Sequence, residues 1–236
     1  MANRTWLRLA ASLLLVGTLI TVVADILHPA GANDHVEAFT TYAASASWTA
    51  VHLAQFVGMA LILGGLLVLF FALDLTDGAA RWVGVFAAVA TGVTLALTGV
   101  LYAVDGVALK QAVQAWASAP PEEAAIRFAS AETIRWLEWG VRSYQDLLFG
   151  SALVLFASVI AWTARVSRML GVVFGLAGLA YITLGWLIGT QGFAPVGEVP
   201  SDAAQTLLVV AIIWLLVIAL RMRAPTTSPM AQPVAS

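Results

Sequence analysis

The residues most able to do chemistry lie where one long apolar segment ends and the next begins. Asp25 and His28 are three residues apart, so they share a face at the end of the first segment. His52 and Gln55 share a face in the same way, just after the second segment begins. Since helices joined by a short loop are neighbours, we expect His28 and His52 to lie at a similar depth and to form one site.

Three kinds of chemistry could use such a site. The imidazoles of His28 and His52 and the carboxylate of Asp25 would be suitable ligands for zinc or another divalent metal ion, and a metal-bound water would make the protein a hydrolase. The two histidines could instead be the axial ligands of a haem in a redox protein. The third possibility is a site that exchanges protons with the outside through His52 and nearby carboxylates.

Further charged residues extend this candidate site. An aspartate at the end of a membrane helix is costly if it is drawn into hydrocarbon, so Asp25 and Asp105 need partners. The sequence predicts a ligand-binding cluster made of Asp25, His28, His52, Gln55, Asp105, Glu138, Arg142 and Asp146. Ion pairing at the membrane surface, or histidines bonded to a neighbouring helix, would explain the same residues without a ligand.

The elements that must position these residues are six apolar segments, each of roughly the 20 residues needed to cross a bilayer core. They run from about 9 to 24, 48 to 73, 82 to 104, 144 to 163, 169 to 190 and 203 to 220. A hydrophobic share of 61%, a charged share of 10% and a mean hydropathy of +0.92 are typical of proteins in lipid rather than in water. We therefore expect an all-α polytopic membrane protein, a bundle of six transmembrane helices in a lipid bilayer.

The connection between the third and fourth segments has the signature of a helix start. Pro120 and Pro121 follow Ser118, and Glu123 can pair with Arg127 one turn later. Apolar and charged residues then alternate as far as residue 142. This pattern predicts an extra interfacial helix that caps the bundle between the third and fourth spans.

The remaining composition limits the number of domains and the classes of partner. We expect a single membrane domain over residues 1–223 and a disordered cytoplasmic tail over 224–236, which is rich in Pro, Ser and Thr. The net charge of −2 provides no basic patch for nucleic acid. The chain has no cysteine, so thiolate metal sites and disulfides are excluded.

The positions of the arginines predict the orientation in the membrane. The loops 28–47 and 191–202 contain no lysine or arginine, so we place them outside and both termini in the cytoplasm. The arginines expected on the cytoplasmic side are Arg4, Arg8, Arg81, Arg165, Arg168, Arg221 and Arg223. The first segment also resembles a signal peptide with a cleavage pattern at 30–32, but its apolar run is longer than usual, so we expect it to be retained.

Small residues predict how the helices pack. The fifth segment carries Gly171 with Gly175, and Gly185 with Gly189, at the GxxxG spacing that allows close approach of helices in lipid. These glycines would serve packing within one chain, a homo-oligomer, or docking to a larger membrane complex.

Several polar positions in their apolar context resemble a known group of proteins. These are Asp25, Leu27-His28-Pro29, Trp48, Val51-His52-Leu53, Phe56-Val57-Gly58 and the stretch 101–110. With them the chain is similar to the DUF4386-like families, small six-helix membrane proteins common in actinobacteria. The resemblance implies a six-helix fold in a bacterial cytoplasmic membrane and no particular activity.

The sequence is best interpreted as an integral membrane protein with an outward-facing polar cavity that binds a small ligand, a proton or a metal ion. A membrane-embedded metal-dependent hydrolase or haem-linked redox protein is one alternative. An accessory subunit of a larger membrane complex is the other.

Overall fold

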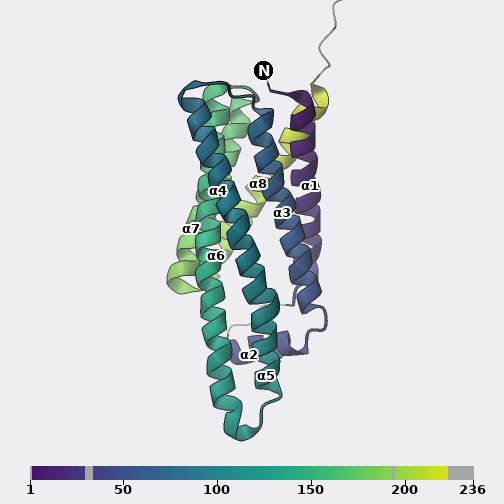
Figure 1. Cartoon of the computed structure of the whole chain (residues 1–236), viewed down its shortest axis with the longest axis vertical. Coiled ribbons are helices and arrows are strands. Elements are labelled where there is room, and N and C mark those ends of the chain that lie inside the picture. Colours follow the sequence, from purple (N-terminus) through teal and green to yellow (C-terminus); the bar gives the residue numbers. More distant parts are fainter. Residues whose placement is uncertain (1, 30–33, 193–194, 223–236) are drawn as a thin grey trace, which may run out of the picture.

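Six long helices form an elongated bundle in the computed structural model, which describes residues 2–29, 34–192 and 195–222 (Figure 1). The long helices are α1 (Arg4–Leu27), α3 (Trp48–Ala72), α4 (Gly78–Ala103), α6 (Pro121–Thr163), α7 (Arg168–Gln191) and α8 (Glu198–Arg221). The shorter elements are α2 (His35–Ala44), the π-helix η1 (Val104–Leu109), α5 (Lys110–Ala117) and the 3₁₀-helix η2 (Pro195–Gly197). Each of the six long elements is long and apolar enough to cross a membrane, which confirms the prediction of an all-α six-helix bundle.

The two ends of the bundle differ. The α3–α4 turn and the α6–α7 turn lie at the end that also holds the start of α1 and the end of α8 (Figure 1). At the other end, here called the α2 end, α1 finishes, α3 begins and α2 crosses the bundle (Figure 1). The predicted tail at 224–236 lies outside the described residues.

The helix pairs α1–α3 and α6–α7 pack backbone against backbone. A Cβ atom added at Gly17 would lie 2.5 Å from the carbonyl oxygen of Gly58, and one added at Gly150 would lie 2.4 Å from that of Gly178. Only glycine permits so close an approach, which is a common means of packing helices in lipid.

The glycines that sequence singled out on α7 also face α6. Cβ atoms added at Gly171, Gly175, Gly185 and Gly189 would each meet atoms of α6 within 3.4 Å. Of the three roles considered for these glycines, the structure therefore shows the first, packing within the chain. Their surface is covered by α6 and is not open to a second chain.

The extra helix expected between the third and fourth spans is not a separate element. It begins at Pro121 as predicted, but it continues without a break into the fourth span as the 43-residue α6. No proline interrupts this stretch after Pro121, and ion pairs three or four residues apart, such as Arg127–Glu123 and Arg142–Asp146, support the helix along its length. The helix expected to cap the bundle between the third and fourth spans is therefore the first part of α6.

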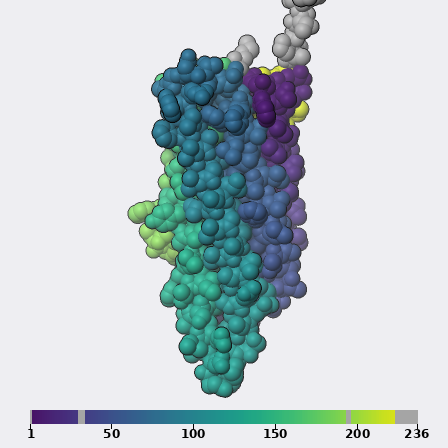
Figure 2. Space-filling view, in the orientation of Figure 1, coloured from purple at the N-terminus to yellow at the C-terminus, as the bar shows by residue number. Residues whose placement is uncertain are grey.

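The third span is prolonged in the same way. From Gly78, α4 continues through η1 and α5 to Ala117, so that 40 residues form one rod of about 60 Å, twice the thickness of a bilayer core. With the first half of α6 it forms a two-helix arm, residues 110–140, that extends beyond α1 and α3 (Figures 1 and 2).

Helix α2, which we did not expect from sequence, packs on this arm. Phe39 and Tyr42 of α2 form a small second core with Leu109, Val113 and Ala131. Lys110 fixes the end of α2, because its ammonium group donates hydrogen bonds to the carbonyl oxygens of Tyr42 (2.7 Å), Ala43 (2.9 Å) and Ser45 (2.6 Å). These are the carbonyls that a helix leaves unpaired at its C-terminus.

Candidate functional site

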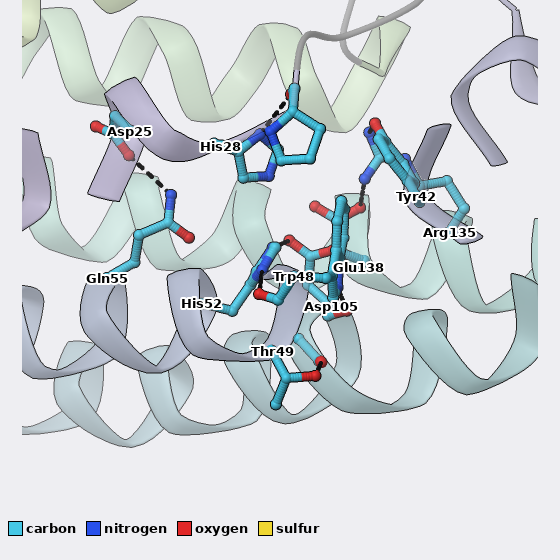
Figure 3. A network of polar contacts seen from close by, with 12 residues as sticks. Asp25, His28, Tyr42, Trp48, Thr49, His52, Gln55, Asp105, Arg135 and Glu138 are labelled. Carbon is cyan, nitrogen blue, oxygen red and sulfur yellow. Dashed lines mark hydrogen bonds and ion pairs between the residues drawn. The ribbon is translucent and has the colours of Figure 1, made fainter. Parts of the chain in front are cut away.

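His52 is the centre of a buried polar network at the α2 end of the bundle (Figure 3). The residue is 1% exposed, and both ring nitrogens have partners. Nδ1 lies 2.7 Å from the carbonyl oxygen of Trp48, one turn earlier in α3, and Nε2 lies 3.0 Å from Oδ2 of Asp105 in η1. The structure therefore joins two residues of the predicted site that are 53 positions apart in sequence.

The π-helix brings Asp105 to this position. The Trp48 indole donates to the carbonyl oxygen of Asp105 (3.0 Å), and the Thr49 hydroxyl donates to that of Gly106 (3.2 Å). A Cβ atom at Gly106 would lie 2.7 Å from Cβ of His52, so only glycine allows this approach. A single turn of π-helix within an α-helix is a frequent feature of functional sites.

The two histidines lie side by side, as predicted. The ring centroids of His28 and His52 are 5.1 Å apart, and His28 also contacts Trp48. His28 Nδ1 lies 2.8 Å from the carbonyl oxygen of Pro29. Burial, and secondly the neighbouring His52, lower the pKa of His28 below its usual value of 6.5, which favours the neutral imidazole.

Asp25 does not turn towards these histidines. Its Oδ1 atom accepts a hydrogen bond of 2.7 Å from the amide of Gln55, and this pair links α1 to α3 beside the histidines (Figure 3). Two aspartates thus contact α3. Asp25 accepts a hydrogen bond from Gln55, and Asp105 lies at hydrogen-bond distance from His52.

Glu138 extends the network to the arm. Its side chain is 2% exposed and lies near Asp105, and it accepts a hydrogen bond of 2.5 Å from Arg135. Arg135 also lies 3.4 Å from the hydroxyl of Tyr42, whose ring packs on Trp48 at 4.3 Å (Figure 3). Burial raises the pKa of Tyr42 above its usual value of 10.0, so its hydroxyl stays protonated.

Arg142 and Asp146, also predicted as site residues, form a separate ion pair. Arg142 Nε lies 2.9 Å from Oδ2 of Asp146 one turn further along α6, and Asp146 is 1% exposed. No hydrogen bond in the described chain links this pair to His52 or Asp105. It neutralises a buried carboxylate within one helix.

Sequence reasoning missed part of this network. In the sequence, Arg135 is one of several charged residues in the stretch that ends at residue 142, and Tyr42 lies in the loop 28–47. Trp48 has the position of an interfacial anchor, so its bond to Asp105 had no sequence signal. The proximity of Arg135 and Glu138, three residues apart on a helix, was the one contact that spacing could have revealed.

The geometry gives no support to a metal or a haem here. Both His52 nitrogens are engaged and Asp25 is bonded to Gln55, and among the described residues no three His, Asp or Glu side chains are arranged as a metal shell. The rings of His28 and His52 are in edge contact, which leaves no space for a macrocycle between two axial ligands.

A cavity of about 230 Å³ lies beside His52, between α3 and the α4–η1 rod. Its walls include Thr49, His52, Phe56, Gly99, Tyr102 and Gly106. None of its described lining residues is a lysine, an arginine or a carboxylate. The cavity therefore suits a neutral occupant.

Comparisons with protein-family models, curated proteins and solved structures return no match for this chain. The chemistry of the site is thus the basis for the function.

Proposed function

We propose that this chain is an integral membrane protein that binds and releases a proton at an outward-facing site, the pair His52–Asp105. The observation that carries this proposal is the placement of the two His52 nitrogens. Nδ1 faces a carbonyl oxygen, which can only accept, so Nδ1 carries a hydrogen. Nε2 faces a carboxylate oxygen at 3.0 Å, and a hydrogen bond there requires one proton, held by either His52 or Asp105.

The short distance between His52 and Asp105 supports occupancy of this proton site. With no proton between them, the lone pair of Nε2 would face a carboxylate oxygen at 3.0 Å, which is costly in a region of low dielectric. Oδ1 of Asp105 is buried and has no hydrogen-bond partner among the described residues, which adds to that cost when Asp105 is ionised.

The lack of ionisable residues between this site and the other end favours exchange with one side only. The stretches 9–24, 53–73, 82–104, 147–164, 169–197 and 203–220 contain no acidic or basic residue and no histidine. Buried apolar side chains such as Leu66, Phe156 and Phe174 fill the bundle there. A proton at His52 therefore exchanges with the α2 end, and we infer a sensor or receptor rather than a conduit.

The location of the protein belongs to the same proposal. Its support is the arginine distribution, which places the α2 end outside a bacterial cytoplasmic membrane and both termini in the cytoplasm. Membership of the DUF4386-like group is likewise proposed, on the residues quoted above.

Nitrogen-15 NMR of selectively labelled histidine tests the proposal, with the full chain in lipid nanodiscs. We expect Nε2 of His52 to carry a proton that it shares with Asp105 and exchanges with water. In Asp105→Asn the Nε2 signal should change, because the imidazole loses its carboxylate partner. The matched control is Asp25→Asn, in which the carboxylate that is lost was bonded to Gln55, so the His52 signals should stay nearly unchanged. If Nε2 shows no shared proton, or if both variants change the His52 signals equally, the proposal is wrong.

A further inference from the structure

The cavity beside His52 leads to an inference beyond proton binding. We propose that it is a binding site for a small neutral aromatic alcohol, such as a simple phenol, that enters from the outer leaflet of the bilayer. The argument depends on the size of the cavity, the kind of side chain on its walls, and one hydroxyl group without a partner.

The size of the cavity sets the size of the ligand. An apolar cavity of about 150 Å³ holds benzene, so a volume of about 230 Å³ has room for roughly nine non-hydrogen atoms. This is a single ring with one or two substituents. A phospholipid headgroup or a dinucleotide is much too large.

The walls favour an aromatic ring. The Tyr102 ring lies 6.2 Å from that of His52 and 6.3 Å from that of Phe56, both in edge-to-face orientation. A third ring in the cavity could therefore contact these rings edge-to-face or in an offset stack, the two arrangements that aromatic pairs prefer. The missing side chain at Gly99 provides part of the space, since a Cβ atom there would meet only Phe56, at 3.9 Å.

One polar group in the wall needs a partner. Tyr102 lines the cavity, and its hydroxyl has no hydrogen bond within the described chain, although Arg142 is a charged neighbour. The nitrogens of His52 and the hydroxyl of Thr49 are already bonded within the protein. A ligand with one hydroxyl group would pair with Tyr102 while its ring fills the apolar part of the cavity.

The rim indicates the route of entry. Leu53 and Val107 border the cavity and are 61% and 46% exposed on the surface of apolar helices. In a bilayer this surface faces lipid, where a neutral phenol partitions readily. The site therefore takes its ligand from the membrane rather than from water.

The test uses 4-fluorophenol and the full chain in phosphatidylcholine nanodiscs, followed by fluorine-19 NMR, with empty nanodiscs to measure simple partition. We expect saturable binding to the wild type. Gly99→Leu fills the cavity and should weaken binding roughly tenfold or more. Gly92→Leu is the matched control on the same helix, because its Cβ atom meets nothing within 4 Å and Gly92 does not line the cavity, so it should bind as the wild type does.

Two further variants keep the test decisive. Gly99→Ala adds only a methyl group in ordinary contact with Phe56 and should weaken binding less than Leu does, with no effect on folding. Tyr102→Phe should weaken binding of 4-fluorophenol but leave that of 4-fluorotoluene, which has no hydroxyl, unchanged. The proposal is overturned if the wild type binds no more 4-fluorophenol than empty nanodiscs do, or if Gly99→Leu binds as well as the wild type. Either result would leave the hydrogen bond between His52 and Asp105 as separate support for the proton site.

Discussion

At the scale of single residues, the site depends on close contact between His52 and the backbone of η1. Asp105 can reach Nε2 of His52 only because residue 106 has no side chain. The two atoms in the tight contact are Cβ of His52 and the Cβ that would be added at Gly106, and no rotation of a side chain can move either of them. A larger residue must therefore separate α3 from η1.

Gly106→Ala is accordingly expected to destabilise the protein by about 1–3 kcal/mol, the usual cost of overpacking. Thermal unfolding in detergent measures this as a lower melting temperature. Gly140→Ala is the control, since a Cβ atom there meets nothing within 4 Å. In the control, better helix propensity should raise stability by up to about 1 kcal/mol. Equal effects of the two substitutions would contradict the close contact.

At the scale of elements, α2 is held over the site by three kinds of contact. Lys110 binds the carbonyls at its end, His35 lies 2.9 Å from Glu132 of α6, and Phe39 and Tyr42 pack into the second core. Tyr42 also covers Trp48, whose carbonyl is bonded to His52. The position of α2 therefore influences the environment of His52.

Lys110→Met should loosen α2 while the spans stay folded. The substitution keeps most of the apolar stem but leaves three carbonyl oxygens without their donor. We expect faster hydrogen exchange across residues 35–44, measured by mass spectrometry, and unchanged exchange in α7. Arg127→Gln breaks an exposed ion pair with Glu123 instead and should leave α2 protected. Unchanged exchange in Lys110→Met would show that packing alone holds α2.

At the scale of the whole molecule, the apolar core and the polar network lie in different parts of the bundle. One half is an apolar bundle joined by glycine contacts, and the α2 end carries the polar network, the cavity and the arm. Such a division suits a protein that responds to conditions on one side of a membrane.

Cysteine labelling tests which side that is. Because the chain has no native cysteine, a maleimide can label only the single cysteine that is introduced. Ser118→Cys lies at the tip of the arm and Thr76→Cys in the exposed turn between α3 and α4, at the opposite end. We expect a membrane-impermeant maleimide to label Ser118→Cys in intact cells and Thr76→Cys only after lysis. The reverse pattern would invert the proposed orientation.

The sequence by itself determined the six spans and the nearness of His28 and His52. Hydropathy depends on each segment's own residues, and a short connection makes two helices neighbours whatever else packs around them. The same local signals placed the start of α6 at Pro121. They did not show that α6 continues into the fourth span. Proline indicates where a helix begins, but the sequence has no comparable signal for a helix that continues.

Only the tertiary structure decided which side chains are partners. Asp25 bonds to Gln55 and Asp105 to His52, although Asp25 is nearer to both in sequence. The choice depends on the rotation of each helix about its axis, and at Asp105 that rotation is set by the π-turn. A π-turn, the packing of α2 and the cavity next to Gly99 all arise from contacts between distant segments, which no local pattern of residues encodes.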